Sequence, residues 1–264
     1  MKKIAVLGPE GTFSDRAAQM YLKSCIEQRQ LIYYPTICKT ISAMDADTDA
    51  IVPLENVLDG FVTETLDTIY DTGCLILKQW SVPIAFRFVG HADSMDAITD
   101  VYVQEKAYGQ CLDFLKNYDF TIHLTKSNTE SYRACKNIGQ GAVIPVHLPV
   151  HAFNLVRKIQ TGNDNQTRFV YLSRRMPPVF PTQGHAFVAI TAKKDRPGLL
   201  YDIIKDLHHL NMRSILSRPN KKDPKKAIFF IEIELKQGQR DLLHSLIEKQ
   251  HPDEVDSVLL GIYR

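Results

Sequence analysis

Short apolar runs alternate with amphipathic stretches along the first two thirds of the chain. Apolar runs that predict strands lie at 4–7, 50–52, 75–82, 85–90, 101–103, 120–124 and 141–145. Stretches with helical periodicity lie between them, at 14–26, 63–70, 107–117 and 129–138. Because strands that alternate with helices form βαβ units, this order predicts an α/β domain with a largely parallel sheet.

The pattern changes at 176–184, where three prolines and a glycine rule out both a helix and a central strand. We therefore expect a linker there. Beyond it the pattern predicts, in order, strand 185–192, helix 199–210, strands 214–218 and 227–235, helix 240–250 and strand 256–262. This βαββαβ order is the ferredoxin-like pattern and predicts a second domain.

Composition and charge exclude several classes of partner. With 32 basic and 30 acidic residues the net charge is +2, which predicts neither nucleic acid nor an anionic membrane as partner. No apolar run approaches the roughly 20 residues of a membrane-spanning helix, and the apolar stretch 4–7 is too short for a signal peptide. The five cysteines are odd in number and form no CxxC pair, so we expect reduced thiols in a cytoplasmic protein.

The first motif, Gly8-Pro9-Glu10-Gly11-Thr12-Phe13-Ser14, lies between a predicted strand and a predicted helix. Glycines let the backbone approach a ligand closely, and the start of a helix offers N–H groups to an anion. The motif lacks the spacing of a nucleotide-binding loop. Spacing alone is also compatible with an ordinary βα turn capped by Thr12 or Ser14.

Two further motifs place polar side chains beside predicted strands. Glu55 and Asn56 directly follow a strand, where ligand sites of open α/β sheets lie, and a carboxyl group there can exchange a proton. Gly60 and Thr63 then lead into a helix. In 165–169, the sequence Asn-Gln-Thr-Arg-Phe offers a guanidinium for a carboxylate and a hydroxyl for a leaving oxygen. A capped surface turn explains the first pattern equally well, and spacing alone favours an exposed strand edge for the second.

Taken together and in this order, the motifs resemble the prephenate dehydratase family. The segment 53–67 resembles its pattern P-x-E-N-S-x-x-G-x-V-x-x-T-L-D, and 167–169 resembles its T-R-F. Two later segments resemble the ligand-binding loops of the family's ACT regulatory domain: Asp195 to Leu200, and Ser217-Arg218-Pro219.

The chain departs from the family pattern at three places. Val57 replaces a serine, and Leu216 replaces the glutamate of an E-S-R-P motif. Residues 104–107 read Gln-Glu-Lys-Ala where the family usually has H-P-Q-A, although the following Gln110-Cys111 pair is retained.

The resemblance implies a fold with three parts. A two-lobed catalytic domain of the type II periplasmic-binding-protein kind would span 1–178, with residues 1–76 and 160–178 in one lobe and 77–159 in the other. An ACT domain with the ferredoxin-like order would span 185–264. The implied activity is the decarboxylating dehydration of prephenate to phenylpyruvate in phenylalanine biosynthesis. Aromatisation drives that reaction, so no metal and no organic cofactor are expected.

The resemblance also implies roles for single residues. The catalytic residues would be Thr167, Glu55 and Asn56, and the sequence leaves open whether Thr167 or Glu55 supplies the proton. The substrate-binding residues would be Thr12, Ser14, Gly60, Thr63, Arg168 and Phe169. Phenylalanine would act as allosteric inhibitor, bound by Asp195, Pro197, Gly198, Leu199, Leu200, Ser217, Arg218 and Pro219.

Further expectations concern assembly and alternative functions. ACT domains usually pair side by side, so we expect a homodimer or homotetramer that forms through them. A divergent prephenate decarboxylase is one alternative, but that group generally lacks both the T-R-F motif and the ACT domain. A catalytically inactive amino-acid-binding regulator is the other, and the changes at Val57 and Gln104 are what favour it.

Overall fold

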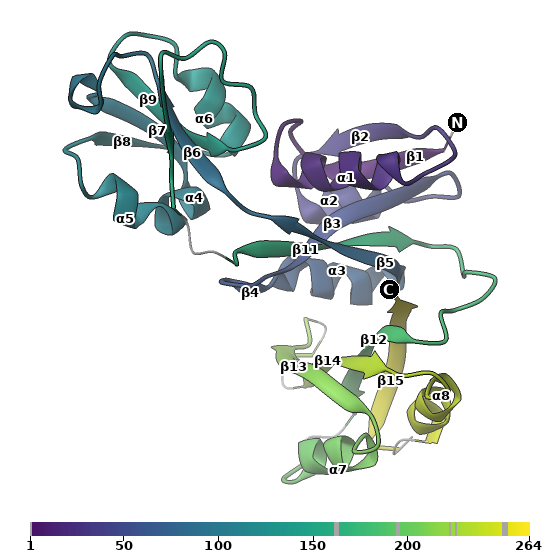
Figure 1. Ribbon diagram of the computed structural model, residues 1–264. Coiled ribbons are helices and arrows are strands. Elements are labelled where there is room, and N and C mark those ends of the chain that lie inside the picture. The colour runs from purple at the N-terminus through teal and green to yellow at the C-terminus, as the bar shows by residue number, and fades with distance from the viewer. Residues whose placement is uncertain (1, 161–163, 194–195, 222, 225, 250–252) are drawn as a thin grey trace. The chain divides into compact units, whose positions relative to one another are not determined.

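The computed structural model describes residues 2–160, 164–193, 196–221, 223–224, 226–249 and 253–264 (Figure 1). Within these residues the strands form three sheets. Contacts divide the chain into two compact units. The first comprises Met1–Thr40, Ile51–Val62 and Ser81–Phe169, and the second comprises Ile41–Ala50, Thr63–Trp80 and Val170–Arg264.

The first sheet has the strand order β2-β1-β3-β11-β5, and the short strand β4 pairs with β3. Strands β1 and β2 run parallel. Its strands are β1 (Lys3–Leu7), β2 (Gln30–Tyr34), β3 (Thr48–Asn56), β4 (Gly60–Phe61), β5 (Leu75–Pro83) and β11 (Gln166–Ser173). The helices of this part of the sequence are α1 (Phe13–Lys23), α2 (Ile37–Ser42) and α3 (Thr63–Thr72). The pattern of the sequence did not predict β2, α2 or β4, and it indicated β11 only as a strand edge at 165–169.

The second sheet has the order β10-β6-β9-β7-β8. Strand β7 runs parallel to β8 and β9, but β6 runs antiparallel to β9 and β10. The expectation of a largely parallel sheet is therefore wrong here, because β6 connects to β7 through a short segment without the long crossover that a parallel pair needs. Its strands are β6 (Phe86–Gly90), β7 (Asp100–Gln104), β8 (Thr121–Thr125), β9 (Gln140–Pro145) and β10 (Leu155–Lys158).

Four short helical segments accompany this second sheet: η1 (Met95–Ala97), α4 (Glu105–Gln110), α5 (Leu112–Leu115) and α6 (Asn128–Ala134). The single helix predicted at 107–117 is divided, because the backbone at Cys111 leaves the helical region with φ −108°. Helix α4 also begins earlier than expected. The Gln104 side chain accepts hydrogen bonds from the N–H groups of Lys106 and Ala107 and so caps its first turn.

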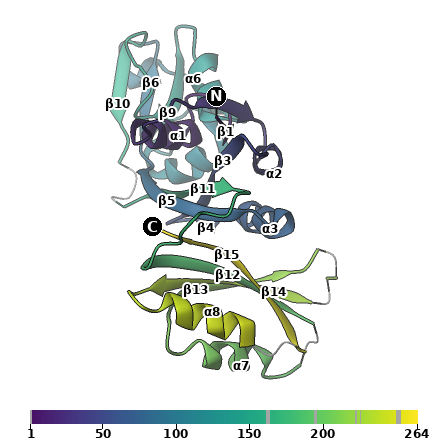
Figure 2. The ribbon, with the colours of Figure 1, turned by 90° about the vertical axis from the view of Figure 1, so that its right-hand side faces the viewer.

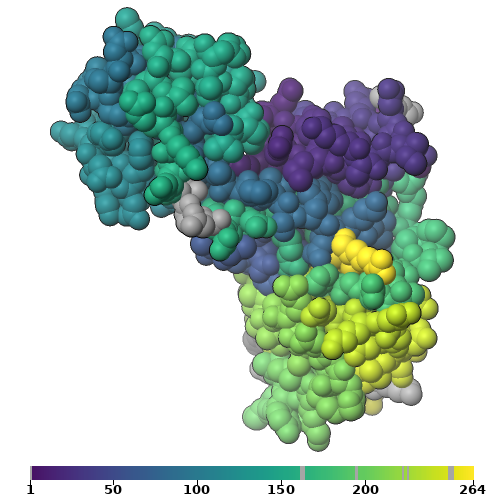
Figure 3. Space-filling view, in the orientation of Figure 1, coloured from purple at the N-terminus to yellow at the C-terminus, as the bar shows by residue number. Residues whose placement is uncertain are grey.

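The C-terminal segment has the predicted βαββαβ order. Its elements are β12 (Gly184–Ala192), α7 (Leu199–Asp206), β13 (Asn211–Pro219), β14 (Ala227–Leu235), α8 (Arg240–Lys249) and β15 (Val255–Tyr263). The sheet is antiparallel with the order β13-β14-β12-β15. Helices α7 and α8 lie on one face of it (Figure 2). In the space-filling view these residues, coloured green to yellow, gather into one body (Figure 3).

The other face of this sheet packs against α3 within the second compact unit. The Tyr70 hydroxyl lies 2.7 Å from the Thr191 hydroxyl, and the Tyr70 ring meets the Phe230 ring edge to face. Arg218 on β13 donates to Asp67 on α3 at 2.9 Å. The C-terminal sheet and the helix that follows the Glu55–Asn56 motif therefore share one packed interface.

Candidate functional site

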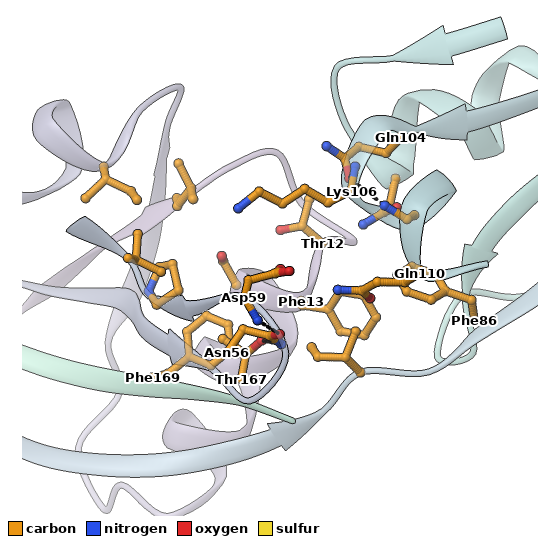
Figure 4. Close-up of a pocket in the computed structure, with 18 residues that line it drawn as sticks. Thr12, Phe13, Asn56, Asp59, Phe86, Gln104, Lys106, Gln110, Thr167 and Phe169 are labelled. Atoms are coloured by element: carbon orange, nitrogen blue, oxygen red, sulfur yellow. Dashed lines mark hydrogen bonds between the residues drawn. The ribbon is translucent and has the colours of Figure 1, made fainter. Parts of the chain in front are cut away.

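A cavity of about 310 Å³ lies in the first compact unit, at the ends of β1, β3 and β7 and at the starts of β11 and α1 (Figure 4). Three phenylalanines contribute to its apolar lining: Phe13, Phe86 and Phe169. Five residues that the sequence analysis assigned to the active site line it: Thr12, Ser14, Asn56, Thr167 and Phe169. The cavity thus combines segments that lie far apart in the sequence.

The loop that precedes α1 is fixed by hydrogen bonds within itself. The Thr12 hydroxyl accepts from the Asp15 N–H at 3.3 Å and donates to the Pro9 carbonyl at 2.9 Å. The Asp15 carboxylate accepts from the Gly11 N–H at 2.9 Å. Thr12 is therefore the N-cap of α1, and its hydroxyl proton is already used by the loop.

Contacts from α6 and from the segment after β9 also hold this loop. The Thr129 hydroxyl donates to the Glu10 carbonyl at 2.8 Å, and His147 Nε2 lies 3.1 Å from the Gly11 carbonyl. Burial lowers the pKa of His147, so a neutral imidazole with its proton on Nε2 makes this bond. Gly11 has φ +85°, and a Cβ there would lie 3.0 Å from the Thr129 hydroxyl, so glycine is required.

Asn56 is at the centre of a buried hydrogen-bond network. Its Oδ1 accepts from the backbone N–H groups of Leu58 at 3.0 Å and Asp59 at 3.2 Å. Its Nδ2 lies 2.9 Å from Thr167 Oγ1 and 2.9 Å from Asn165 Oδ1. Because a backbone N–H can only donate, the oxygen of the Asn56 amide must face Leu58 and Asp59, and its amine must face Thr167.

This orientation of Asn56 determines what the Thr167 hydroxyl can do. Oγ1 accepts a hydrogen bond from the Asn56 amine, so its own proton is available for another partner. No described residue accepts that proton, and the side chain lines the cavity. Thr167 therefore presents a hydrogen-bond donor to a bound ligand.

Glu55 and Arg168 pair with each other rather than lining the cavity. Arg168 Nη2 donates to Glu55 Oε2 at 2.7 Å, and the guanidinium lies 5.9 Å from the centre of the Phe61 ring. Successive side chains of a strand point to opposite faces, so Arg168 faces away from its neighbours Thr167 and Phe169. The same alternation separates Glu55 from Asn56. This geometry disfavours the expected acid role of Glu55 and the expected substrate contact of Arg168.

Gly60 and Thr63 are not among the residues that line the cavity. Gly60 has φ +75° and pairs with Asn56 in the β3–β4 hairpin, so it shapes the turn that Asn56 closes. Thr63 is the first residue of α3. Val57 is 65% exposed and does not line the cavity. Valine in place of the family's serine therefore removes no hydroxyl from the cavity.

Five polar residues that line the cavity were not assigned to the site from the sequence: Asp59, Gln104, Lys106, Gln110 and Asn128. Lys106 is the only lysine or arginine among the described lining residues, and Figure 4 shows its side chain reaching into the cavity from α4. The departure from the family pattern at 104–107 and the retained Gln110 were the available signals. Their place in the site depends on how β7 and α4 meet β11.

The expected effector residues lie around the start of α7 and along β13. A cavity of about 480 Å³ is lined by Arg196, Gly198, Leu199, Leu200, Tyr201, Ile204 and Phe229. Gly198 has φ +85° and is the N-cap of α7. Arg196 donates to Glu254 and to Asp202, both at 2.8 Å. Asp195 lies outside the described residues, and Pro197 is exposed between Arg196 and Gly198.

The second group of expected effector residues does not share one face of the sheet. Ser217 and Pro219 are exposed on β13, whereas Arg218 between them is half-buried. The Arg218 guanidinium donates to Asp67, whose side chain is 9% exposed. Arg218 therefore contacts α3 on the face opposite to Ser217, which disfavours direct contact with the same ligand.

All five cysteines are free thiols, as expected. No group of three His, Cys, Asp or Glu side chains among the described residues has the arrangement of a metal site. None of the described helices is long and apolar enough to cross a membrane.

Comparisons with known proteins point to one family over most of the chain. Residues 4–177 match the family model described as prephenate dehydratase. A bifunctional chorismate mutase/prephenate dehydratase from Aquifex aeolicus is 28% identical over 88% of this chain, which spans 65% of that relative's length. A prephenate dehydratase from Methanocaldococcus jannaschii is 26% identical over 97% of this chain and 95% of its own.

Solved structures share the fold over nearly the whole chain. The prephenate dehydratase from Staphylococcus aureus superposes with a TM-score of 0.78 at 22% identity and covers 100% of both chains. The prephenate dehydratase from Arthrobacter aurescens, solved in complex with L-Phe, gives a TM-score of 0.79 at 22% identity. It covers 99% of this chain and 89% of its own. The fold of this chain, with the C-terminal sheet included, thus occurs in these solved proteins.

Proposed function

Since this chain belongs to the prephenate dehydratase family, whose model matches residues 4–177, we propose that it converts prephenate to phenylpyruvate. The observation that carries the proposal is the Thr167 hydroxyl, which Asn56 orients as a donor into a largely apolar cavity. The free cysteines support a cytoplasmic location for this activity.

The reaction needs a proton donor and a site that excludes water. One carboxylate of prephenate leaves the ring as CO₂, and the electron pair of the broken C–C bond enters the ring. The hydroxyl at the opposite ring carbon leaves with a proton as water, so the dianion and one proton yield phenylpyruvate, CO₂ and water. Aromatisation supplies the driving force, so positioning and charge stabilisation are what the protein must provide.

The cavity supplies these requirements from named residues. Thr167 donates to the leaving hydroxyl, while the proton of Thr12 is held by its own loop. Glu55 is less suited to be the acid because its carboxylate is bonded to Arg168 and does not line the cavity. Phe13, Phe86 and Phe169 exclude water from the departing carboxylate, which favours the uncharged product CO₂.

The proposal is tested by incubating the purified protein with prephenate and following the ultraviolet absorbance of phenylpyruvate. Formation of phenylpyruvate supports the function. A decarboxylated product that is not aromatic would identify the divergent decarboxylase instead. Binding of an amino acid without turnover of prephenate would identify the inactive regulator.

Lys106 supplies a positive charge that attracts a substrate with two carboxylates. Lys106→Gln restores the family's usual side chain and removes the charge, so KM for prephenate should rise about 10-fold while kcat changes little. Steady-state kinetics at two salt concentrations measures this, and the wild-type KM should rise more steeply with salt than that of the variant. The matched control is Lys136→Gln, an exposed lysine that does not line this cavity. An unchanged KM in Lys106→Gln would place the carboxylate contacts elsewhere.

The C-terminal βαββαβ segment is an ACT domain that binds phenylalanine in this proposal. The N–H groups at the start of α7 suit an α-carboxylate, and the cavity lined by Leu199, Tyr201 and Phe229 suits an aromatic side chain. Phenylalanine inhibits by binding the less active state better. Strand β13 is an edge of its sheet, so pairing with the same strand of a second copy gives a homodimer or homotetramer.

Gly198→Val should weaken inhibition by phenylalanine about 10-fold or more, because a β-branched residue at φ +85° distorts the start of α7. Its uninhibited turnover should remain at the wild-type level. Gly238→Val is the matched control, since Gly238 has φ +84° in the same segment but does not line this cavity. Calorimetry and inhibition curves measure the effect. Equal loss of phenylalanine binding in both variants would count against a site at α7.

A further inference from the structure

A chain of side-chain amides runs from the β3–β4 turn to α4. It begins at Asn56, whose amine donates to Asn165 Oδ1 at 2.9 Å. Asn165 Nδ2 in turn donates to Gln110 Oε1 at 3.0 Å. Asn56 and Asn165 are 7% and 5% exposed, so water competes little for these bonds.

The backbone determines the direction of every bond in this chain. The N–H groups of Leu58 and Asp59 fix the oxygen of Asn56, and therefore its amine faces Asn165. Asn165 must accept with its oxygen, which leaves its amine to face Gln110. Gln110 must then accept with its oxygen, so its own amine is left to face the cavity that the residue lines. No described residue accepts a hydrogen bond from that amine.

We propose that Gln110 donates a hydrogen bond to a carboxylate or ketone oxygen of the substrate, and that Asn165 is the positioning residue that fixes this polarity. The inference rests on the proposed function, since prephenate carries such oxygens in addition to its leaving hydroxyl. The same amide chain that makes Thr167 a donor thus makes Gln110 a second donor. Two donors oriented before binding reduce the reorganisation that substrate binding requires.

Asn165→Asp tests the direction of the chain with little change in shape. Both oxygens of the new carboxylate can only accept, so Gln110 must turn its amine toward residue 165 and present its oxygen to the substrate. An oxygen that faces an oxygen is repulsive, so the dissociation constant for prephenate should rise about 30-fold. Gln110→Met keeps the length of the side chain and removes its donor, so it should raise the constant about 10-fold.

The double variant separates polarity from the added negative charge. In the Gln110→Met background no amide can be reversed, so Asn165→Asp should raise the dissociation constant by only about 3-fold more. Calorimetry with prephenate and steady-state KM values both measure the cycle, and thermal unfolding confirms that each variant is folded.

Two results would overturn this role of Gln110. One is a wild-type affinity for prephenate in Gln110→Met. This measurement tests the role of Gln110 even if Asn165→Asp does not fold. The other is an equal effect of Asn165→Asp in both backgrounds, which would assign that effect to charge alone. A wild-type protein that binds no prephenate would instead remove the proposed function together with this inference.

Discussion

Thr167→Ala should lower kcat with prephenate by about 10²-fold or more, because a positioned proton donor contributes that much to a leaving-group departure. The fold should persist. The Asn56 amine loses one acceptor but keeps the Asn165 oxygen at 2.9 Å and the Gln166 carbonyl at 3.1 Å. Steady-state assays of phenylpyruvate formation measure the change in kcat, and circular dichroism tests whether the fold persists.

Thr167→Ser is the control, since serine restores the hydroxyl without the methyl group. We expect most of the turnover to return in this variant. Turnover near the wild-type level in Thr167→Ala would assign the proton to another group, and Glu55 would then be the first candidate despite its pair with Arg168.

Asn56→Asp should also lower kcat by about 10²-fold, although the side chain keeps its shape. The new carboxylate can still accept from the N–H groups of Leu58 and Asp59, so the turn is maintained. It cannot donate to Thr167, whose hydroxyl must then give its proton to residue 56 rather than to the substrate. The loss therefore comes from a reversed hydrogen bond at Thr167.

The dependence of this loss on Thr167 distinguishes it from a general effect of charge. In a Thr167→Ala background, Asn56→Asp should reduce kcat much less than it does in the wild type. Asn117→Asp introduces the same charge at an exposed position just after α5 and should leave kcat unchanged. Independent, multiplying losses at the two positions would contradict the orientation of Thr167 by Asn56.

Helix α3 connects the turn at Asn56 to the C-terminal sheet. This helix directly follows the turn that Asn56 and Gly60 form, and its Asp67 is bonded to Arg218 of β13. Its Tyr70 contacts Thr191 and Phe230 of the same sheet. The C-terminal sheet and α3 are therefore joined by direct side-chain contacts.

Local patterns in the sequence were sufficient for several features. These are the βαββαβ order, the linker before Gly184 and the capped start of α1 at Thr12, which depend on periodicity, proline and capping. Each of these signals acts over a few neighbouring residues, so it can be read without knowing where distant segments lie. The resemblance to the family rests on short motifs and on the order in which they occur along the chain.

Tertiary structure alone decided which side chains meet. Arg168 and Thr167 are neighbours in sequence, yet the alternation along β11 directs one to Glu55 and the other into the cavity. Gln110 and Asn165 are 55 positions apart, and their hydrogen bond exists only because α4 and the start of β11 come together. The direction of the amide chain depends on three-dimensional donor and acceptor geometry, which no local pattern encodes, and this direction determines what the site can donate.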